Sequence, residues 1–131
     1  MAHAAGTFTV ASWDENTYQE LADPAKLTKL TATFAMEGDI TGQATWDAVM
    51  YYRPDGTAAY TGMQRFEGEL GGVEGSFVVR ADGEFIDGEA RTAWDAVTGS
   101  GTGGLAGLTG RGSAVATATP PGSFTFDYDL G

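Results

Sequence analysis

The 131-residue sequence contains no cysteine, which excludes disulfide bonds, thiolate catalysis and cysteine-ligated metals. It contains a single histidine, His3, so a zinc site and a serine–histidine triad both lack the residues they need. Basic residues are scarce, with 7 against 18 acidic ones and a formal net charge of −11. Such a chain repels nucleic-acid phosphates and anionic lipids, so neither nucleic acid nor a membrane is expected as a partner.

Long apolar runs are also absent. No stretch approaches the roughly 18–20 apolar residues of a membrane-spanning helix. The first ten residues, MAHAAGTFTV, lack the charged segment and apolar core of a signal peptide. These absences favour a cytoplasmic protein, and no cofactor or metal is expected. His3 is expected to precede the first strand as a frayed terminal residue.

Glycine, in contrast, is abundant, at 20 of 131 residues, about twice its usual share of ~7%. It follows no Gly-X-Y period, so a collagen-like chain is not expected. Apolar and polar residues alternate along much of the chain, as in LTATFAMEG, where Leu30, Ala32, Phe34 and Met36 share one face. This period of two is typical of half-buried β-strands.

Turn signals divide the alternating segments. RPDG at residues 53–56 and the pair Gly71-Gly72 both predict tight turns, and Pro120-Pro121 interrupts the chain again. About eight strands result. The sequence therefore predicts an all-β fold, an antiparallel meander closed into a roughly eight-stranded barrel, as a single domain over residues 1–131.

Two segments depart from this strand pattern. Residues 14–26, DENTYQELADPAK, are expected to hold at most a helical turn, which Pro24 limits. GSGTGG at residues 99–104 formally matches a dinucleotide-binding fingerprint, but the glycines that follow break any helix. We expect this segment to be a loop that helps to shape the mouth of the barrel.

The tetrapeptide WDAV occurs twice, without any longer repeat around it. The simplest interpretation is one strand pattern used twice, with Trp46 and Trp94 inside the barrel and Asp47 and Asp95 outside. By the same parity, Arg65 faces outward.

Acidic pairs mark the outer surface. Glu67 and Glu69 share one strand face and are expected to pair with Arg65, while Asp127 and Asp129 share another. A cation site is conceivable there, but solvated surface carboxylates are the common outcome.

Five segments together carry a resemblance: GTFTVASWDENTY, GDITGQATWDAVMYYRPDG, YTGMQRFEGELGGVEGSFVV, TAWDAVTGSGTGGLAGLTGRG and FTFDYDL. In this order they resemble the bacterial domain-of-unknown-function 3224 family over nearly the whole chain. The resemblance implies a barrel shaped like that of allene oxide cyclase, a cofactor-free isomerase of a lipid epoxide. Spirotetronate cyclases are bacterial proteins of similar shape. It implies no activity for the family itself.

The chain differs from the pattern of that family at three positions. Relatives often carry Glu where this chain has Gln64 and His where it has Ala81, so a Glu–His acid/base pair is absent. Trp46 also stands where relatives have a smaller residue, which narrows the interior.

Two interpretations of the inward aromatic residues stay open. They either fill a solid core or line an apolar pocket with a few polar groups. In the second case Tyr60, Gln64 and Tyr128 are the candidate catalytic residues. The candidate ligand-binding residues are Trp46, Met50, Phe66, Phe77, Trp94, Phe124 and Phe126.

The function predicted from the sequence is a small-molecule-binding barrel, with a cofactor-free cyclase or isomerase as the enzymatic form. A non-catalytic carrier of hydrophobic molecules, and a filled barrel acting through its acidic surface, are the alternatives. The expected partner is an apolar small molecule, and assembly into a homo-oligomer is left open.

Overall fold

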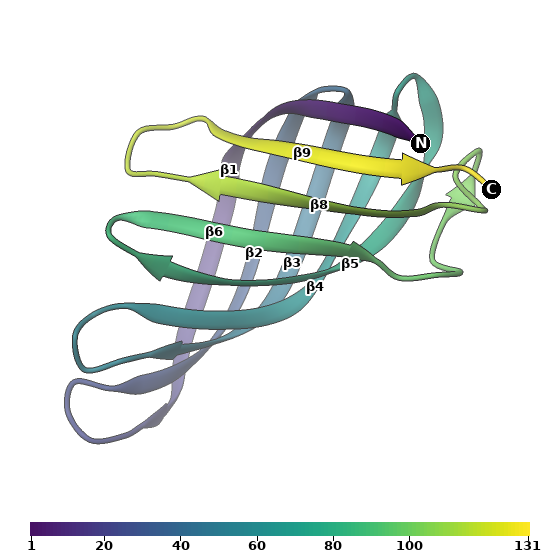
Figure 1. The fold of residues 1–131 in the computed structure, drawn as a ribbon. Coiled ribbons are helices and arrows are strands. Elements are labelled where there is room, and N and C mark those ends of the chain that lie inside the picture. The colour runs from purple at the N-terminus through teal and green to yellow at the C-terminus, as the bar shows by residue number, and fades with distance from the viewer.

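Nine β-strands make up the regular structure in the computed structural model, which describes all residues 1–131 (Figure 1). The strands are β1 (Ala2–Glu20), β2 (Lys26–Gly38), β3 (Ile40–Tyr52), β4 (Ala58–Leu70), β5 (Val73–Ile86), β6 (Glu89–Ala96), β7 (Thr102–Gly103), β8 (Thr109–Ala116) and β9 (Gly122–Asp129). The structure has no helix of the length and apolarity needed to cross a lipid bilayer.

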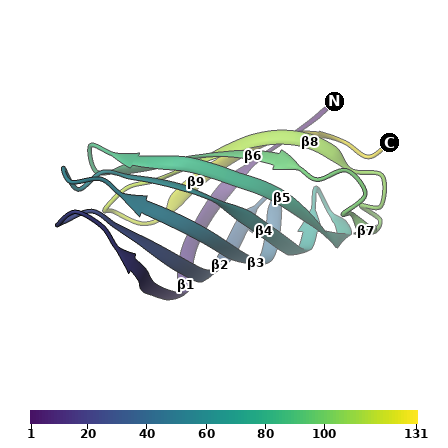
Figure 2. The same ribbon diagram turned by 90° about the horizontal axis from the view of Figure 1, so that it is seen from below.

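Eight of the strands close into a barrel. They are hydrogen-bonded in the order β4-β3-β2-β1-β9-β8-β6-β5, every pair is antiparallel, and a β4–β5 pairing joins the two ends. The two-residue strand β7 lies outside this ring and pairs with β5 (Figure 2). The all-β meander predicted from the sequence is therefore confirmed. Closure removes most of the free sheet edges that would otherwise invite aggregation, and the part of β1 beyond Phe8 keeps one unpaired edge.

Alternation along the strands separates the inside from the outside as predicted. In β3 and β6, Trp46 and Trp94 are buried, whereas Asp47 and Asp95 are exposed. Arg65 is also exposed and contacts Glu67 at 3.2 Å. Parity along a pleated strand was enough to assign these faces.

The predicted turn between β4 and β5 is confirmed in detail. Gly71 and Gly72 connect the strands, with φ of 57° and 83°. Two consecutive positive φ values are typical of the type I′ turn, which suits the twist of a hairpin and strongly favours glycine.

The N-terminal segment differs from the prediction in two respects. Residues 14–20 continue β1 as a strand instead of forming a helical turn, because each side of the β1–β2 hairpin satisfies the other's backbone groups. His3 lies within β1, where its Nδ1 is 2.6 Å from Asp127 on β9, and not before the first strand.

A β-bulge at Ala11 changes which residues of β1 face inward. Before it, Phe8 and Val10 lie opposite inward positions of β2; after it, Trp13 and Glu15 do so. An extra residue in one strand shifts the parity by one, and every later side chain changes face. The bulge thus turns an acidic side chain toward the barrel interior.

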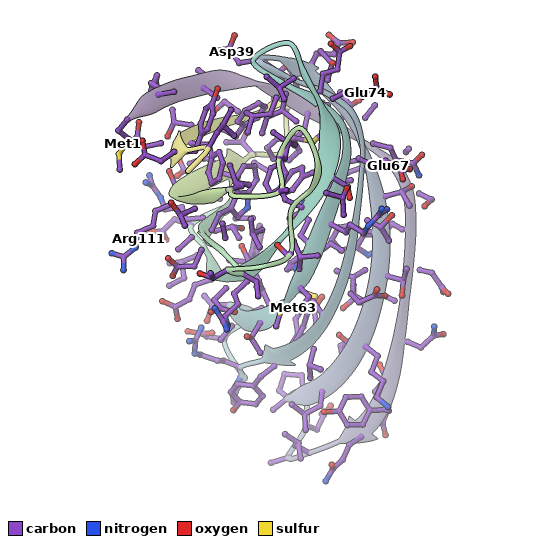
Figure 3. All side chains as sticks on the ribbon, turned by 90° about the vertical axis from the view of Figure 1, so that its right-hand side faces the viewer. Met1, Asp39, Met63, Glu67, Glu74 and Arg111 are labelled. Carbon is purple, nitrogen blue, oxygen red and sulfur yellow. The ribbon has the colours of Figure 1, made fainter.

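One end of the barrel is closed by the glycine-rich segment. Leu105 and Leu108, which follow β7, are 1% and 2% exposed and cover the ends of the strands. This corrects the expectation that the segment shapes the mouth, because the pairing of β7 with β5 holds it at the opposite end. Figure 3 looks onto this closed end, with Glu67, Glu74 and Arg111 on the outside.

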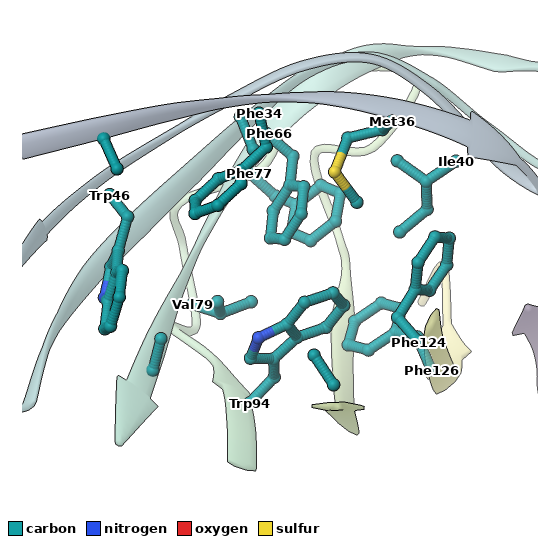
Figure 4. Packing of buried hydrophobic residues seen from close by; sticks show 14 of the residues in the cluster. Phe34, Met36, Ile40, Trp46, Phe66, Phe77, Val79, Trp94, Phe124 and Phe126 are labelled. Atoms are coloured by element: carbon teal, nitrogen blue, oxygen red, sulfur yellow. The ribbon is translucent and has the colours of Figure 1, made fainter. Parts of the chain in front are cut away.

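Aromatic side chains fill the interior next to the closed end. Phe126 stacks on Phe77 with ring centroids 5.5 Å apart and on Tyr128 at 5.7 Å. Phe66 stacks on Phe77 at 4.8 Å and contacts Trp94 edge-on at 5.0 Å. In Figure 4 the rings of Phe66, Phe77, Trp94 and Phe126 form one group, and Trp46 stands apart from it. This half of the barrel is a solid core.

Candidate ligand pocket

The other half of the barrel is hollow. A cavity of about 450 Å³ lies there, lined by 20 residues, of which 15 are hydrophobic. The lining comprises Phe8, Val10, Trp13, Phe34, Trp46, Met50, Tyr52, Gly56, Ala58, Tyr60, Gln64, Phe85, Gly88, Ala90, Thr92, Trp94, Ala114, Ala116, Thr117 and Ala118. This volume lies within the range of small-molecule sites, about 300–1,000 Å³.

The mouth of the cavity is lined by residues of the connections between strands. These connections lie at the end of the barrel opposite β7 (Figure 2). Gly56 comes from the β3–β4 turn, Gly88 from the β5–β6 turn, and Thr117 and Ala118 follow β8. Strand β9 pairs with β1 only as far as Phe8, so the rest of β1 has a neighbour on one side only. Access from solvent is therefore available beside this part of β1.

Small inward residues keep this half open. Ala58, Ala90, Ala114 and Ala116 all line the cavity, whereas the corresponding layer at the closed end carries phenylalanines. A methyl group fills far less volume than a phenyl ring, and a rigid barrel backbone does not collapse to compensate. The cavity is thus a consequence of side-chain size on the inner face.

The structure separates the predicted site residues into two groups. Trp46, Met50, Tyr60, Gln64 and Trp94 line the cavity. The other predicted ligand-binding residues, which belong to the solid core, are Phe66, Phe77, Phe124 and Phe126.

Tyr128 also lies apart from the cavity. It stacks on Phe126, and its hydroxyl is so close to the β4–β5 turn that a Cβ at Gly71 would lie 2.6 Å away from it. The two interpretations of the inward aromatics therefore each describe one half of the barrel.

The Tyr60 hydroxyl is held by neighbouring groups. It lies 2.8 Å from the Thr92 hydroxyl and donates to the Arg91 carbonyl at 3.3 Å. Burial raises the pKa of Tyr60, and the Thr92 hydrogen bond only partly offsets this. Tyr60 is therefore a neutral hydrogen-bonding group at physiological pH.

Gln64 and Trp46 face each other across β3 and β4, on the inner side. Gln64 is 6% exposed and lines the cavity, and no side-chain hydrogen bond holds its amide. Unlike that amide, the Nε1–H of Trp46 is completely buried, and it has no partner. Buried polar groups are almost always hydrogen-bonded in folded proteins, so this indole is a notable exception.

Glu15 accepts three hydrogen bonds beside the mouth of the cavity. The donors are the Tyr52 hydroxyl at 2.5 Å, the Thr28 hydroxyl at 2.7 Å and the Trp13 indole at 3.1 Å. These groups come from three neighbouring strands, and they fasten β1 to the wall of the barrel. The side chain of Lys26 lies over the Tyr52 ring at 5.1 Å.

This hydrogen bonding sets the protonation of the cluster. Burial raises the pKa of Glu15, but the hydrogen bonds and the Lys26 charge together outweigh it, so the net pKa is lowered. Burial, with the adjacent Glu15 carboxylate, raises the pKa of Tyr52. At neutral pH the pair is therefore an ionised carboxylate that accepts from a neutral phenol.

Four residues at or beside the cavity were not predicted from the sequence. Trp13, Tyr52 and Thr92 line it, and Glu15 lies beside its mouth. Glu15 and Trp13 were missed because the bulge at Ala11 reverses the parity of β1. Tyr52 shares the parity of Trp46 and Met50 and was open to detection by alternation alone.

No charged side chain lines the cavity, and no three acidic or histidine side chains gather closely enough to hold a metal ion. The polar groups present can hydrogen-bond a ligand and orient it. None of the phenols has a lowered pKa, so none is poised as a strong acid.

A shallower depression lies on the outer surface. Asp82, Glu84, Asp87 and Glu89 contribute to its lining, together with Arg91. Arg91 is 2.6 Å from Glu89, so the only cation is paired. Four carboxylates and one guanidinium make this depression acidic.

Comparison with known proteins agrees with the fold. Residues 4–128 match the family described as "Protein of unknown function (DUF3224)". A protein of unknown function from the DUF3224 family of Shewanella oneidensis MR-1 has a similar structure, with a TM-score of 0.84. The two sequences are 22% identical, and the similarity covers 100% of this chain and 98% of that chain. No curated protein matches the chain. Since the family match spans nearly the whole sequence, the chain belongs to the DUF3224 family.

Proposed function

We propose that the barrel binds an apolar small molecule in the cavity and, as an enzyme, would cyclise or isomerise it without a cofactor. The observation that carries the proposal is the cavity itself, about 450 Å³ and lined by 15 hydrophobic residues among 20. Concave apolar sites with a few convergent polar groups are the usual form of small-molecule sites. The sequence resemblance to the DUF3224 family implies a barrel shaped like that of allene oxide cyclase, and this expectation is in keeping with the proposal.

The proposed chemistry rests on orientation. A flexible substrate held against Trp46 and Trp94 would lose the freedom that otherwise keeps its reacting atoms apart, and such ordering contributes several kcal/mol. Hydrogen bonds from Gln64 or Tyr60 would polarise one oxygen of the substrate. A cyclisation or isomerisation leaves the atomic composition unchanged, so no co-reactant is required. Tyr128 has no part in this proposal because it lies in the solid core.

A non-catalytic carrier is the second candidate. The observation that favours it is the raised pKa of both Tyr52 and Tyr60, which leaves the pocket without a strong acid. Carrier and enzyme bind the same kind of molecule. They differ in whether the bound molecule emerges with a changed structure.

Intrinsic fluorescence tests binding directly, because all three tryptophans line the cavity. Purified protein is titrated with a panel of polyenes, aromatic ketones and apolar acids, and each binder is then incubated and analysed by chromatography for isomeric products. A saturable signal is the expected result. Absence of any signal would refute the pocket proposal and direct attention to the acidic outer surface.

Two variants on β6 show whether the signal comes from the cavity. Ala90 lines it, and Ala93 faces outward on the same strand. Ala90→Phe should fill the mouth and weaken binding at least about tenfold, which corresponds to 1.4 kcal/mol, whereas Ala93→Phe should leave it unchanged. Equal effects of both changes would place the binding elsewhere.

A further inference from the structure

We infer that the ligand of this pocket is uncharged and carries a hydrogen-bond-accepting oxygen, such as that of a ketone, an ester or an epoxide, which meets Gln64 and Trp46. The inference rests on the proposed function and specifies the class of molecule bound. It depends on which polar groups of the pocket lack a protein partner and on where the charges around the pocket lie.

Gln64 is the main observation. It projects inward from β4 between Trp46 on β3 and Val79 on β5, and it is almost completely buried. No protein side chain or backbone group holds its amide, whose polar atoms border the cavity and are not completely buried. An amide in an apolar wall needs a partner from the cavity itself, either water or a ligand. A polar group of a ligand is the partner that the lining of the cavity provides for.

Trp46 determines the polarity of that partner. Its Nε1–H is completely buried without an acceptor, so a ligand oxygen reaches it only through a small shift of the indole, and an indole can only donate. The amino group of Gln64 is a second donor across the strand pair. Two neighbouring donors are best satisfied by an acceptor with two lone pairs, which a carbonyl or ether oxygen supplies.

The other polar groups of the pocket are already engaged. The Tyr60 hydroxyl pairs with Thr92, and the Tyr52 hydroxyl pairs with Glu15. They therefore compete less well for a ligand oxygen. The end of the cavity near Gln64 remains the position where an oxygen gains most.

The surrounding charge excludes an anion. No Lys, Arg or His lines the cavity. Of the nearby cations, Lys26 lies over the Tyr52 ring beside Glu15, and Arg53 is 2.5 Å from Glu84. A carboxylate in this pocket would lose its hydration without gaining a counter-ion, next to a chain of net charge −11. A neutral oxygen avoids that penalty.

The test uses three ligands of one shape: 4-acetylbiphenyl, 4-isopropylbiphenyl and biphenyl-4-carboxylate. They are compared at neutral pH by displacement of the uncharged dye N-phenyl-1-naphthylamine. The ketone is expected to bind most tightly and the carboxylate at least about tenfold more weakly than the ketone. A carboxylate that binds as well as the ketone would overturn the inference and leave the pocket proposal standing. If none of the three binds, the pocket proposal fails as well.

Gln64→Leu supplies the residue-level test. It should weaken the ketone by about 3- to 10-fold, the range of one hydrogen bond, and leave the hydrocarbon unchanged or slightly tighter. Gln43→Leu, at an exposed position of the neighbouring strand β3, is the matched control and should change neither. Equal weakening of the ketone and the hydrocarbon would indicate a change of pocket shape and refute the role of the amide.

Discussion

Replacement of Phe126 by alanine should be among the most destabilising single changes in this protein. The side chain is fully buried, and it stacks between Phe77 and Tyr128 while also contacting Trp94. Truncation of a buried phenylalanine to alanine costs about 3–5 kcal/mol through lost transfer energy and the cavity left behind. Two lost stacking pairs, each worth about 0.5–1.5 kcal/mol, place the estimate near the upper end of that range.

The measurement is urea unfolding followed by far-UV circular dichroism. A loss of about 4–5 kcal/mol would consume much of the roughly 5–15 kcal/mol that stabilises a domain of this size. Phe85→Ala is the control, since that ring lies at the mouth and is 40% exposed; its cost should stay below about 1 kcal/mol. Similar losses for the two variants would show that the closed half is not the stabilising core.

Two further changes compare the partly buried carboxylate of Glu15 with the exposed contact of His3. Glu15 has a lowered pKa in the folded state, so its contribution to stability is present above the unfolded value of about 4.5 and is lost as the pH falls through the folded value; Glu15→Gln should therefore flatten the acid limb of a plot of Tm against pH, and parallel curves would contradict this. His3→Ala removes the contact between His3 and Asp127, two side chains that are both more than half exposed. Exposed ion pairs contribute little, so the free energy of unfolding near neutral pH should match that of the wild type to within about 0.5 kcal/mol. A larger loss would show that this contact anchors β1 to β9.

Strand parity predicted the fold and the direction of most side chains. The alternation from Leu30 to Met36 and the turn at Gly71-Gly72 are both local signals, and both were confirmed. The helical turn predicted for residues 14–26 was wrong, because pairing with β2 outweighs the local preference of residues 14–20. Asp14, Asn16 and Glu20 are weak strand formers, yet β2 provides hydrogen-bonding partners along this part of β1.

The candidate site was predicted only in part, for a geometric reason. Alternation predicts that Trp46 and Phe126 both face inward. It does not predict how far along the barrel axis each side chain lies. That depth depends on the stagger between strands, which is fixed only when the barrel closes. The residues predicted to bind a ligand therefore divide between the solid core and the cavity. The bulge at Ala11, which no local pattern marks, hid Glu15 as well.

The division of the barrel into a packed half and an open half separates stability from binding. Strands β1 to β5 have 13 to 19 residues and β6, β8 and β9 have 8 each, so one wall extends beyond the other at the mouth. Stacked rings at the closed end supply the dense contacts that hold all eight strands in register. The open half is then free to retain an amide that borders the cavity without a protein partner, a group that a solid core would not tolerate. Substitutions near Gln64 should consequently change ligand preference at little cost in stability. Substitutions around Phe126 should lower stability and leave ligand preference unchanged.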